Sequence, residues 1–505
     1  MPSRASPWLL VIVCASAALD VWQIGWGLPS DYGWAPDELV PSAVLAGAAQ
    51  GFSRGWYEKY PPFHYALLAI TYVPVAAASR AAGLSPAQMM HALFLAGRAL
   101  SVVMAAGTVL LVYRISRVAQ DETASVLAAG LAAFTPTFVY YAKVANLDAP
   151  YVFWFCLSLL FYVRALAHPR RRDCVGFAMA AAAAIATKDQ AYGLYLGAVP
   201  FLFWKLRARR RDLLAAAVAG VLTLLVLDNA LLNPIGLREH LALAAGPASR
   251  AFRMFPANAR GELLLALDTL SQLRFVLGWP ALVACAAGLA WAARERASLL
   301  LATLVPIASY LIGFVGVVLY VYDRFLLPVA VVMALFGGFF LSRLIQRSRA
   351  AGLAAAIAVL GWGAVRAASV DVLMAADGRY DVEKRLRQEA SGRLVAAAGP
   401  LEYLPRLDGL RWHRLGPSLR RLAEMKPDFV VVNADYARRA DPGTGERQLY
   451  DALDSGSAGY ALEFSHRRRP PSVLRDEDWS PERPLPILTN LDKIDPEIRV
   501  YRRRE

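Results

Sequence analysis

The stretch Trp34-Ala-Pro-Asp-Glu38 directly follows the first apolar run of the chain and places two carboxylates at its end. A second stretch, Glu58-Lys-Tyr-Pro-Pro62, adds a cation one short segment later. Charged side chains beside hydrocarbon cost free energy, and where they occur they commonly mark a binding site or a transport pathway. We therefore expect the functional site to be built around these two stretches, at the mouth of a bundle of apolar helices.

The composition indicates a protein that crosses a membrane many times. Hydrophobic residues make up 57% of the 505 residues and charged residues 19%, whereas soluble domains carry about 25% charged residues. The apolar residues fall in long runs up to residue 374. Because a membrane helix needs about 20 apolar residues, the sequence predicts a mainly α polytopic membrane protein with about eleven transmembrane helices. This part covers residues 1–375, and a small soluble α/β domain covers residues 376–505.

Basic residues set the predicted orientation, because cytoplasmic loops are richer in Lys and Arg. The N-terminus is expected in the cytoplasm and the C-terminal domain on the periplasmic side of a bacterial plasma (inner) membrane. The same bias explains the net charge of +14. The basic clusters lack the interleaved aromatic residues of a base-stacking surface, so no nucleic-acid partner is expected. The expected spans are approximately residues 7–28, 90–113, 124–141, 149–166, 174–187, 191–204, 213–232, 275–293, 299–320, 325–344 and 353–374.

Two long segments are expected outside the membrane. Residues 30–83 form the first outer loop, in which residues 38–52 have the apolar spacing of a surface helix. Residues 61–82 are long enough to cross, but a crossing there would put the later basic loops on the outer face. We therefore predict an interfacial or re-entrant segment. Residues 233–270 form the second long outer loop.

The tail after the last span has a different pattern. Residues 381–398 have the charge spacing of a helix, and residues 428–433 form an apolar run that ends in a turn, as a buried strand does. Residues 460–464 and 498–501 are further candidate strands. Alternation of strands and helices predicts a small α/β domain.

Two acidic residues are candidates for catalysis at the outer face. A transfer to a hydroxyl or amino group needs a positioned base, and Asp37 stands just outside the first apolar run. Asp148 opens another span at the same face, where the alternative explanation is a helix cap. Glu38 either joins Asp37 in catalysis or, with it, begins the surface helix and complements its dipole.

Four cations on the same face are candidates for binding a phosphate, since Arg contacts phosphate through two hydrogen bonds and Lys supplies a point charge. Each could instead contact lipid head groups, which are expected partners in any case. Lys188 and Asp189 separate two short spans, where they either neutralise each other or support the site. Tyr57 is a further candidate for supporting the site. The four phosphate-binding candidates are Lys59, Arg250, Arg253 and Arg324.

The sequence leaves metal use open. Two carboxylates such as those of Asp37 and Asp148 are ligands that a divalent cation accepts, but they can also act without one. No cluster of His and Glu has the spacing of a zinc site. No phosphate-cradling glycine loop is present, so transport driven by ATP is not supported.

The order of these motifs resembles the GT-C glycosyltransferases, in the branch of the protein O-mannosyltransferases and the lipid A aminoarabinose transferase. The resemblance covers residues 7–372 and is carried by Pro36-Asp-Glu38, Tyr57-Glu-Lys59, Asn146-Leu-Asp148, Thr187-Lys188 and Tyr322-Asp-Arg-Phe-Leu-Leu-Pro328. It implies a polyprenyl-phosphate sugar as donor and a glycan, lipid or protein as acceptor. It also implies that Asp37 is the base, that Asp148 is a second site carboxylate, and that Lys59 lies near the donor phosphate with an arginine of the long outer loop, Arg250 or Arg253. The sequence departs from that family in two places: the gap between Glu38 and Lys59 is short, and Tyr60 precedes the prolines.

Two functions from different classes follow. The first is an inverting hexosyl or pentosyl transferase in which Asp37 takes the acceptor proton. The second is a transporter or binding protein for a lipid-linked sugar, which the charges between the short spans would also suit.

Overall fold

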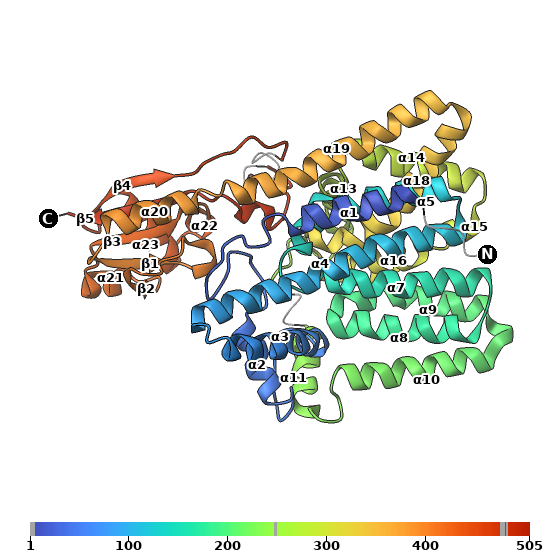
Figure 1. The fold of residues 1–505 in the computed structure, drawn as a ribbon, viewed down its shortest axis with the longest axis horizontal. Helices are drawn as coiled ribbons and strands as arrows, with labels where there is room; N and C mark the ends of the chain where they lie inside the picture. Colours follow the sequence, from blue (N-terminus) through green and yellow to red (C-terminus); the bar gives the residue numbers. More distant parts are fainter. Residues whose placement is uncertain (1–5, 247–249, 475–479, 481–482, 505) are drawn as a thin grey trace.

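The computed structural model describes residues 6–246, 250–474, 480 and 483–504. It has a bundle of long helices and, at one end of the bundle, a small α/β domain (Figure 1). The helices of the first part are α1 (Pro7–Val21), α2 (Pro41–Ala49), α3 (Phe63–Ala81), α4 (Pro86–Ala119), α5 (Glu122–Ala133), α6 (Pro136–Ala142), α7 (Asp148–Ala167), α8 (Arg171–Thr187), α9 (Tyr192–Lys205), α10 (Arg210–Leu227), α11 (Pro234–Ala244), α13 (Ala259–Leu277), α14 (Trp279–Arg294), α15 (Ser298–Leu301), α16 (Leu304–Tyr310), α17 (Gly316–Val318), α18 (Leu327–Arg347) and α19 (Arg349–Ala375).

The chain is a multi-pass membrane protein. In the described part of the chain, five helical segments are long and apolar enough to cross a membrane, and up to seven if two bent pairs each count as one span. The predicted number of about eleven is not confirmed. Several expected spans form helices that are too short to be counted, because α1 has 15 residues, α8 has 17 and α9 has 14. The five segments are Pro86–Ala119, Asp148–Ala167, Ser298–Val318, Asp323–Arg347 and Arg349–Glu389.

Two helix pairs are bent, one within the span expected at residues 124–141 and one near the start of the span expected at residues 275–293. α5 and α6 meet at 68°, where Pro136 begins the second helix and removes a backbone donor. α13 and α14 meet at 113° around Gly278, whose φ of 76° lies in the left-handed region that glycine adopts most easily. Residues 233–270 are the predicted second long outer loop, and their place outside the membrane stays a prediction. α11 and the first half of α13 occupy much of that segment, because Asn233 and Asn258 cap the two helices.

The first outer segment contains two helices, as the sequence predicts. α2 begins at Pro41, three residues after the acidic pair, so Asp37 and Glu38 do not lie in its first turn. α3 packs against α2 and α4, and these elements gather with α11 at one end of the bundle (Figure 1). α3 is not among the segments apolar enough to cross a membrane. The interfacial placement of residues 61–82 stays a prediction.

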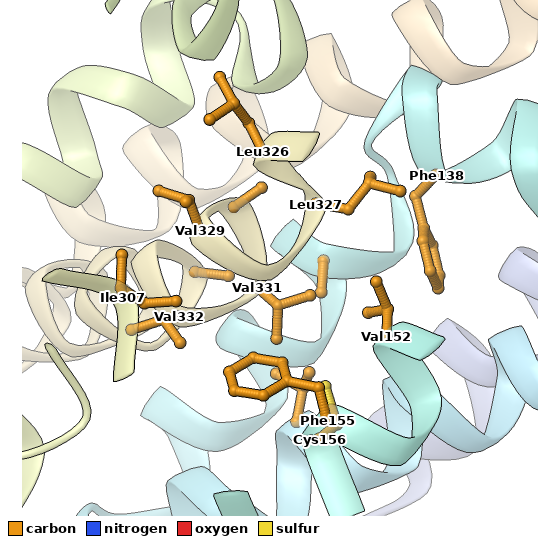
Figure 2. Packing of buried hydrophobic residues seen from close by; sticks show 14 of the residues in the cluster. Phe138, Val152, Phe155, Cys156, Ile307, Leu326, Leu327, Val329, Val331 and Val332 are labelled. Atoms are coloured by element: carbon orange, nitrogen blue, oxygen red, sulfur yellow. The ribbon is translucent and has the colours of Figure 1, made fainter. Parts of the chain in front are cut away.

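A continuous apolar core holds the helices whose first residues build the site. Figure 2 shows Val152 and Phe155 of α7 facing Val331 of α18. Phe138 of α6 packs into the same cluster, and all four side chains are buried. Buried apolar side chains fit together at close to crystal density, so the first turns of α7 and α18 have little freedom to shift.

The C-terminal domain is an α/β sandwich. Its sheet has the strand order β2-β1-β3-β5-β4, with β1, β2 and β3 parallel and β5 antiparallel to both β3 and β4. α20 packs on one face, and α21, α22 and α23 pack on the other. The elements are α20 (Arg379–Glu389), β1 (Leu394–Ala398), β2 (Arg411–Leu415), α21 (Leu419–Met425), β3 (Phe429–Asn433), α22 (Ala434–Arg439), α23 (Gly445–Asp454), β4 (Tyr460–His466) and β5 (Ile498–Arg503).

The predicted strands at 428–433, 460–464 and 498–501 correspond to β3, β4 and β5. The helix predicted for residues 381–398 ends at Glu389, and the remainder contains β1, a correction. β1 reads Leu-Val-Ala-Ala-Ala, and alanine favours a helix in isolation. Here β1 is paired on both sides and four of its five residues are buried, so its place in the sheet overrides that preference.

The two parts of the molecule are held together close to the loop that follows α1 (Figure 1). The indole of Trp26 donates a hydrogen bond to Asp377, and Arg406 donates one to the carbonyl of Leu28 at 2.6 Å. A further contact joins the C-terminal domain to the turn before α18, where Thr489 donates to the buried carboxylate of Asp323 at 2.7 Å. The C-terminal domain therefore lies against the end of the bundle that carries the acidic stretch.

Candidate active site

The two neighbouring acids of the opening stretch point to different places. The backbone of Asp37 is in the left-handed region, with φ at 61°, which aspartate tolerates better than most residues. This turn leaves the Asp37 side chain 39% exposed, whereas the Glu38 side chain is fully buried. One sharp turn thus separates a carboxylate that can meet a substrate from one that cannot.

Glu38 forms a buried ion pair with Arg98 of α4. The guanidinium donates to both carboxylate oxygens, with Nε–Oε1 at 2.7 Å and Nη2–Oε2 at 2.6 Å. The backbone amide of Ala145 also donates to Glu38, at 2.9 Å. Gly33 approaches this pair so closely that a Cβ atom there would lie 2.7 Å from the carboxylate. All these contacts are internal, which suits a residue that positions the loop of Asp37.

Asp148 is the first residue of α7 and is 2% exposed. Its carboxylate accepts a hydrogen bond from the ammonium of Lys188 at 2.6 Å and another from the Asn146 amide at 3.2 Å. It does not cap its own helix, since the cap position is Leu147 and has no side-chain bond. The capping explanation considered for Asp148 is therefore wrong.

Arg324 connects the two acids. It lies in a short 3-10 turn before α18 and donates to Asp37 at 2.6 Å, and the same nitrogen is 3.9 Å from Asp148. The sequence separations are large, because Asp37 and Arg324 are 287 residues apart. Asp37, Asp148, Arg324 and Lys188 thus form one cluster, which we call the charged cluster.

Lys59 is exposed beside this cluster. Its ammonium lies 5.3 Å from the ring of Tyr60 and 5.9 Å from the ring of Phe252. Phe252 belongs to the segment that contains Arg250 and Arg253, and its ring contacts that of Tyr320 at 5.8 Å. Both arginines are exposed, and within the described part of the chain neither takes part in the ion pairs of the cluster.

The cations control the ionisation of Asp37. Partial burial raises its pKa, but the Arg324 guanidinium, followed by the ammonium groups of Lys59 and Lys188, outweighs this effect. The pKa of Asp37 is consequently lowered from its ordinary value of 3.8. The carboxylate form is the one present at neutral pH, as a proton acceptor requires.

Lys188 and Asp189 do not neutralise each other. Lys188 turns towards Asp148, and Asp189 turns the other way and lies 2.9 Å from His240 of α11. The two short helices α8 and α9 meet at this point, as the sequence predicts. Tyr57 is exposed and lines a small cleft with His240, so the structure brings Asp189 and Tyr57 together near α11 and not at the charged cluster.

Sequence reasoning missed the partner of Glu38 and the aromatic side chains of the site. Lys188 lies over the rings of Tyr60 and Tyr151, and Arg324 lies over the ring of Tyr322 at 4.7 Å. Tyr403 of the C-terminal domain is near enough to Asp37 that the carboxylate contributes, after burial and Glu402, to raising the pKa of its phenol. Tyr60 and Tyr322 lie within quoted motifs without having been assigned a role, but no local signal pointed to Arg98 or Tyr403.

Basic side chains balance the negative charges of the two carboxylates of the site. Each of the two acids of the charged cluster faces a cation, Arg324 for Asp37 and Lys188 for Asp148. Over the described residues, no group of three or more His, Cys, Asp or Glu side chains is arranged to hold a metal ion. The donor set therefore fits a divalent cation poorly.

One protein family matches part of the chain. Residues 87–232 match the model described as dolichyl-phosphate-mannose-protein mannosyltransferase. Over these residues, the match confirms the resemblance to the protein mannosyltransferases. The matched stretch contains Asp148 and Lys188, whereas Asp37, Lys59 and Arg324 lie outside it. A comparison with curated proteins found no match.

Several solved structures are similar to this one. ArnT from Cupriavidus metallidurans bound to undecaprenyl phosphate is 16% identical, with a TM-score of 0.49 over 75% of this chain and 72% of that chain. The apo oligosaccharyltransferase of Archaeoglobus fulgidus is 13% identical, with a TM-score of 0.49 over 94% of this chain and 75% of that chain. The S. cerevisiae protein O-mannosyltransferase Pmt1-Pmt2 complex bound to its sugar donor is 17% identical, with a TM-score of 0.31 over 55% of this chain and 37% of that chain.

Proposed function

We propose that this chain is a membrane glycosyltransferase that moves a hexosyl or pentosyl group from a polyprenyl-phosphate donor to an acceptor at the outer face of the membrane. The observation that carries the proposal is the charged cluster, in which Arg324 faces both Asp37 and Asp148. A lipid-linked phosphate needs cations, and an attacking hydroxyl needs a base, and the cluster offers both at one end of the bundle. The match to a mannosyltransferase family supports the same reaction class.

The reaction we propose is a single displacement with inversion at the anomeric carbon. The acceptor oxygen attacks C1 of the sugar and forms the new glycosidic bond. The bond between C1 and the phosphate oxygen breaks, and its electron pair leaves with the polyprenyl phosphate. Asp37 takes the proton of the acceptor hydroxyl, and cations that contact the leaving phosphate lower the energy of the charge that develops there.

Arg324 has two roles in this proposal. Before the donor binds, it pairs with Asp37 at 2.6 Å and makes that carboxylate a weaker base. A phosphate dianion or diester beside Lys59 competes for the same guanidinium, because Arg forms strong charge-assisted bonds with phosphate. Transfer of Arg324 from Asp37 to the phosphate frees the base when the donor is in place. Asp148 and Lys188 remain paired in this step.

The replacement Asp37→Asn tests the proposal. Purified protein in lipid nanodiscs is incubated with radiolabelled polyprenyl-phosphate hexose or pentose and an envelope extract as acceptor. Loss of a positioned base lowers transfer by roughly 10²- to 10⁴-fold. Asp31→Asn is the matched control, since Asp31 is an exposed acid of the same loop and should keep wild-type transfer.

Three outcomes separate the functions. Transfer by wild type that Asp37→Asn abolishes supports a transferase with Asp37 as base. Near wild-type transfer by Asp37→Asn removes the base role and leaves the transferase. Binding or translocation of the donor by wild type, with no cleavage under any acceptor condition, favours the alternative transporter, for which the buried Lys188 between α8 and α9 is the supporting feature.

A further inference from the structure

The C-terminal domain contains a crevice that the proposed chemistry does not use. It opens at the carboxyl ends of the parallel strands β1, β2 and β3, and its cavity volume is about 110 Å³. The chain passes from β1 to β2 on one side and returns to β3 on the other, so the strand order reverses here. In open α/β sheets, ligands bind at this reversal, outside the carboxyl ends of the strands.

Turn residues keep the crevice open. β1 is followed by Gly399-Pro400 and β2 by Gly416-Pro417, so both strands stop at the same edge with a glycine and a residue that cannot continue the ladder. Gly399 has a φ of 115°, which an L side chain adopts only with strain. α23 starts at Gly445, where a Cβ atom would lie 2.4 Å from the carbonyl of Pro417. This close approach of α23 closes one wall.

The lining chemistry suits an uncharged polar ligand. Its charged members are Arg414 and Glu446, whose charges cancel, and its other polar groups include the Asn433 amide and the phenols of Tyr436 and Tyr450. Tyr rings offer flat apolar faces next to polar tips. Guanidinium, carboxylate and amide groups can each form two hydrogen bonds with neighbouring hydroxyls. A sugar ring has an apolar face and many hydroxyls, whereas a phosphate or a membrane surface would require an excess of positive charge.

One wall of the crevice leads to the charged cluster. The ring of Tyr436 lies 5.1 Å from that of Tyr403. Asn433 holds this contact, because its amide donates to the carbonyl of Tyr403 at 3.0 Å while its side-chain oxygen accepts from the backbone of Tyr436 at 2.9 Å. Tyr403 in turn is an electrostatic neighbour of Asp37. In Figure 1, α22, which carries Tyr436, lies on the side of the domain that faces the helical bundle.

We propose that this crevice binds the glycan portion of the acceptor, with sugar rings against Tyr436 and hydroxyls on Glu446 and Asn433. A glycan seated there would run past Tyr403 and present its next hydroxyl to Asp37. The inference rests on the proposed transferase function and narrows its acceptor from glycan, lipid or protein to a carbohydrate chain. Tyr436 and Glu446 are binding residues in this account, remote from the bonds that change.

The test uses the full chain in nanodiscs with a radiolabelled polyprenyl-phosphate sugar. The acceptor pool is the oligosaccharide fraction of the cell envelope, freed of lipid and protein. We expect Tyr436→Ala and Glu446→Gln each to lower kcat/KM for this pool by at least about tenfold, which corresponds to the loss of one or two good contacts. The KM for donor and the slow cleavage of donor by water should not change. Tyr436→Phe, which keeps the ring, should retain most of the activity.

Controls keep the result interpretable. Gln448 lies on the exposed side of α23, so Gln448→Ala should behave as wild type. Unchanged donor hydrolysis shows that each variant still folds around its active site. Normal acceptor kinetics in both crevice variants would overturn this inference alone, and so would transfer that occurs with the whole envelope extract but not with its oligosaccharide fraction. A wild-type protein that never cleaves donor would overturn the proposed function and, with it, the inference that rests on it.

Discussion

The ion pair between Glu38 and Arg98 allows a quantitative test of which acid in the opening stretch does chemistry. The side chains are 0% and 1% exposed, and the guanidinium holds both carboxylate oxygens. Removing one partner of such a pair leaves an uncompensated buried charge and costs about 3–5 kcal/mol. We expect Glu38→Gln to lower the free energy of unfolding by that amount and to reduce transfer, because the loop of Asp37 loses its anchor.

The double variant separates positioning from catalysis. Glu38→Gln with Arg98→Met removes both charges, so most of the lost stability should return, with a coupling free energy of at least about 2 kcal/mol in the double-mutant cycle. Arg98→Met alone should be milder than Glu38→Gln, because a buried carboxyl can take up a proton and an arginine cannot release one. Transfer should recover with stability if Glu38 only positions the loop.

The assay measures unfolding in mixed micelles by titration with a denaturing detergent, alongside transfer from a polyprenyl-phosphate sugar. Glu38→Gln protein that is as stable as wild type would refute the cost assigned to the buried pair. A double variant that regains stability but stays inactive would refute the positioning role and return Glu38 to the catalytic group. The exposed Asp31→Asn variant serves again as the control.

Two more predictions concern the charged cluster. Arg324→Gln removes the main cause of the lowered pKa of Asp37, so burial then raises that pKa, and the acid limb of the kcat/KM profile should move to higher pH. An acid limb that does not move in Arg324→Gln would contradict the effect of Arg324 on the pKa of Asp37. In wild type the pKa of Asp37 in the folded state lies below its value in the unfolded state, so the stability that Asp37 contributes is present above about pH 4 and is lost as the pH falls through the folded pKa. Because Arg324 and Lys188 already balance Asp37 and Asp148, a chelator at millimolar concentration should leave transfer unchanged, and loss of activity that added Mg²⁺ or Mn²⁺ restores would show that a metal is required.

Local patterns predicted much of the architecture. Apolar run length gave the helical part and its boundary with the tail, and β3, β4 and β5 were found from short apolar runs. The predicted number of crossings is not confirmed, because run length does not show where a helix stops. α5 ends before Pro136, and this break divides the span expected at residues 124–141 into a bent pair; α13 ends before Gly278, near the start of the span expected at residues 275–293.

The order of residues alone determined that Asp37, Asp148, Lys59 and Arg324 stand at ends of apolar segments, since hydropathy and charge are read directly along the chain. Only the tertiary structure decided which of them pair. Lys188 pairs with Asp148, 40 residues away, and not with the adjacent Asp189. Neighbours in a chain leave a helix end in different directions, whereas the first turns of α7 and α18 are held together by the core beneath them. A buried charge pairs with the opposite charge that helix packing brings within reach, so the tertiary structure determines the pairing.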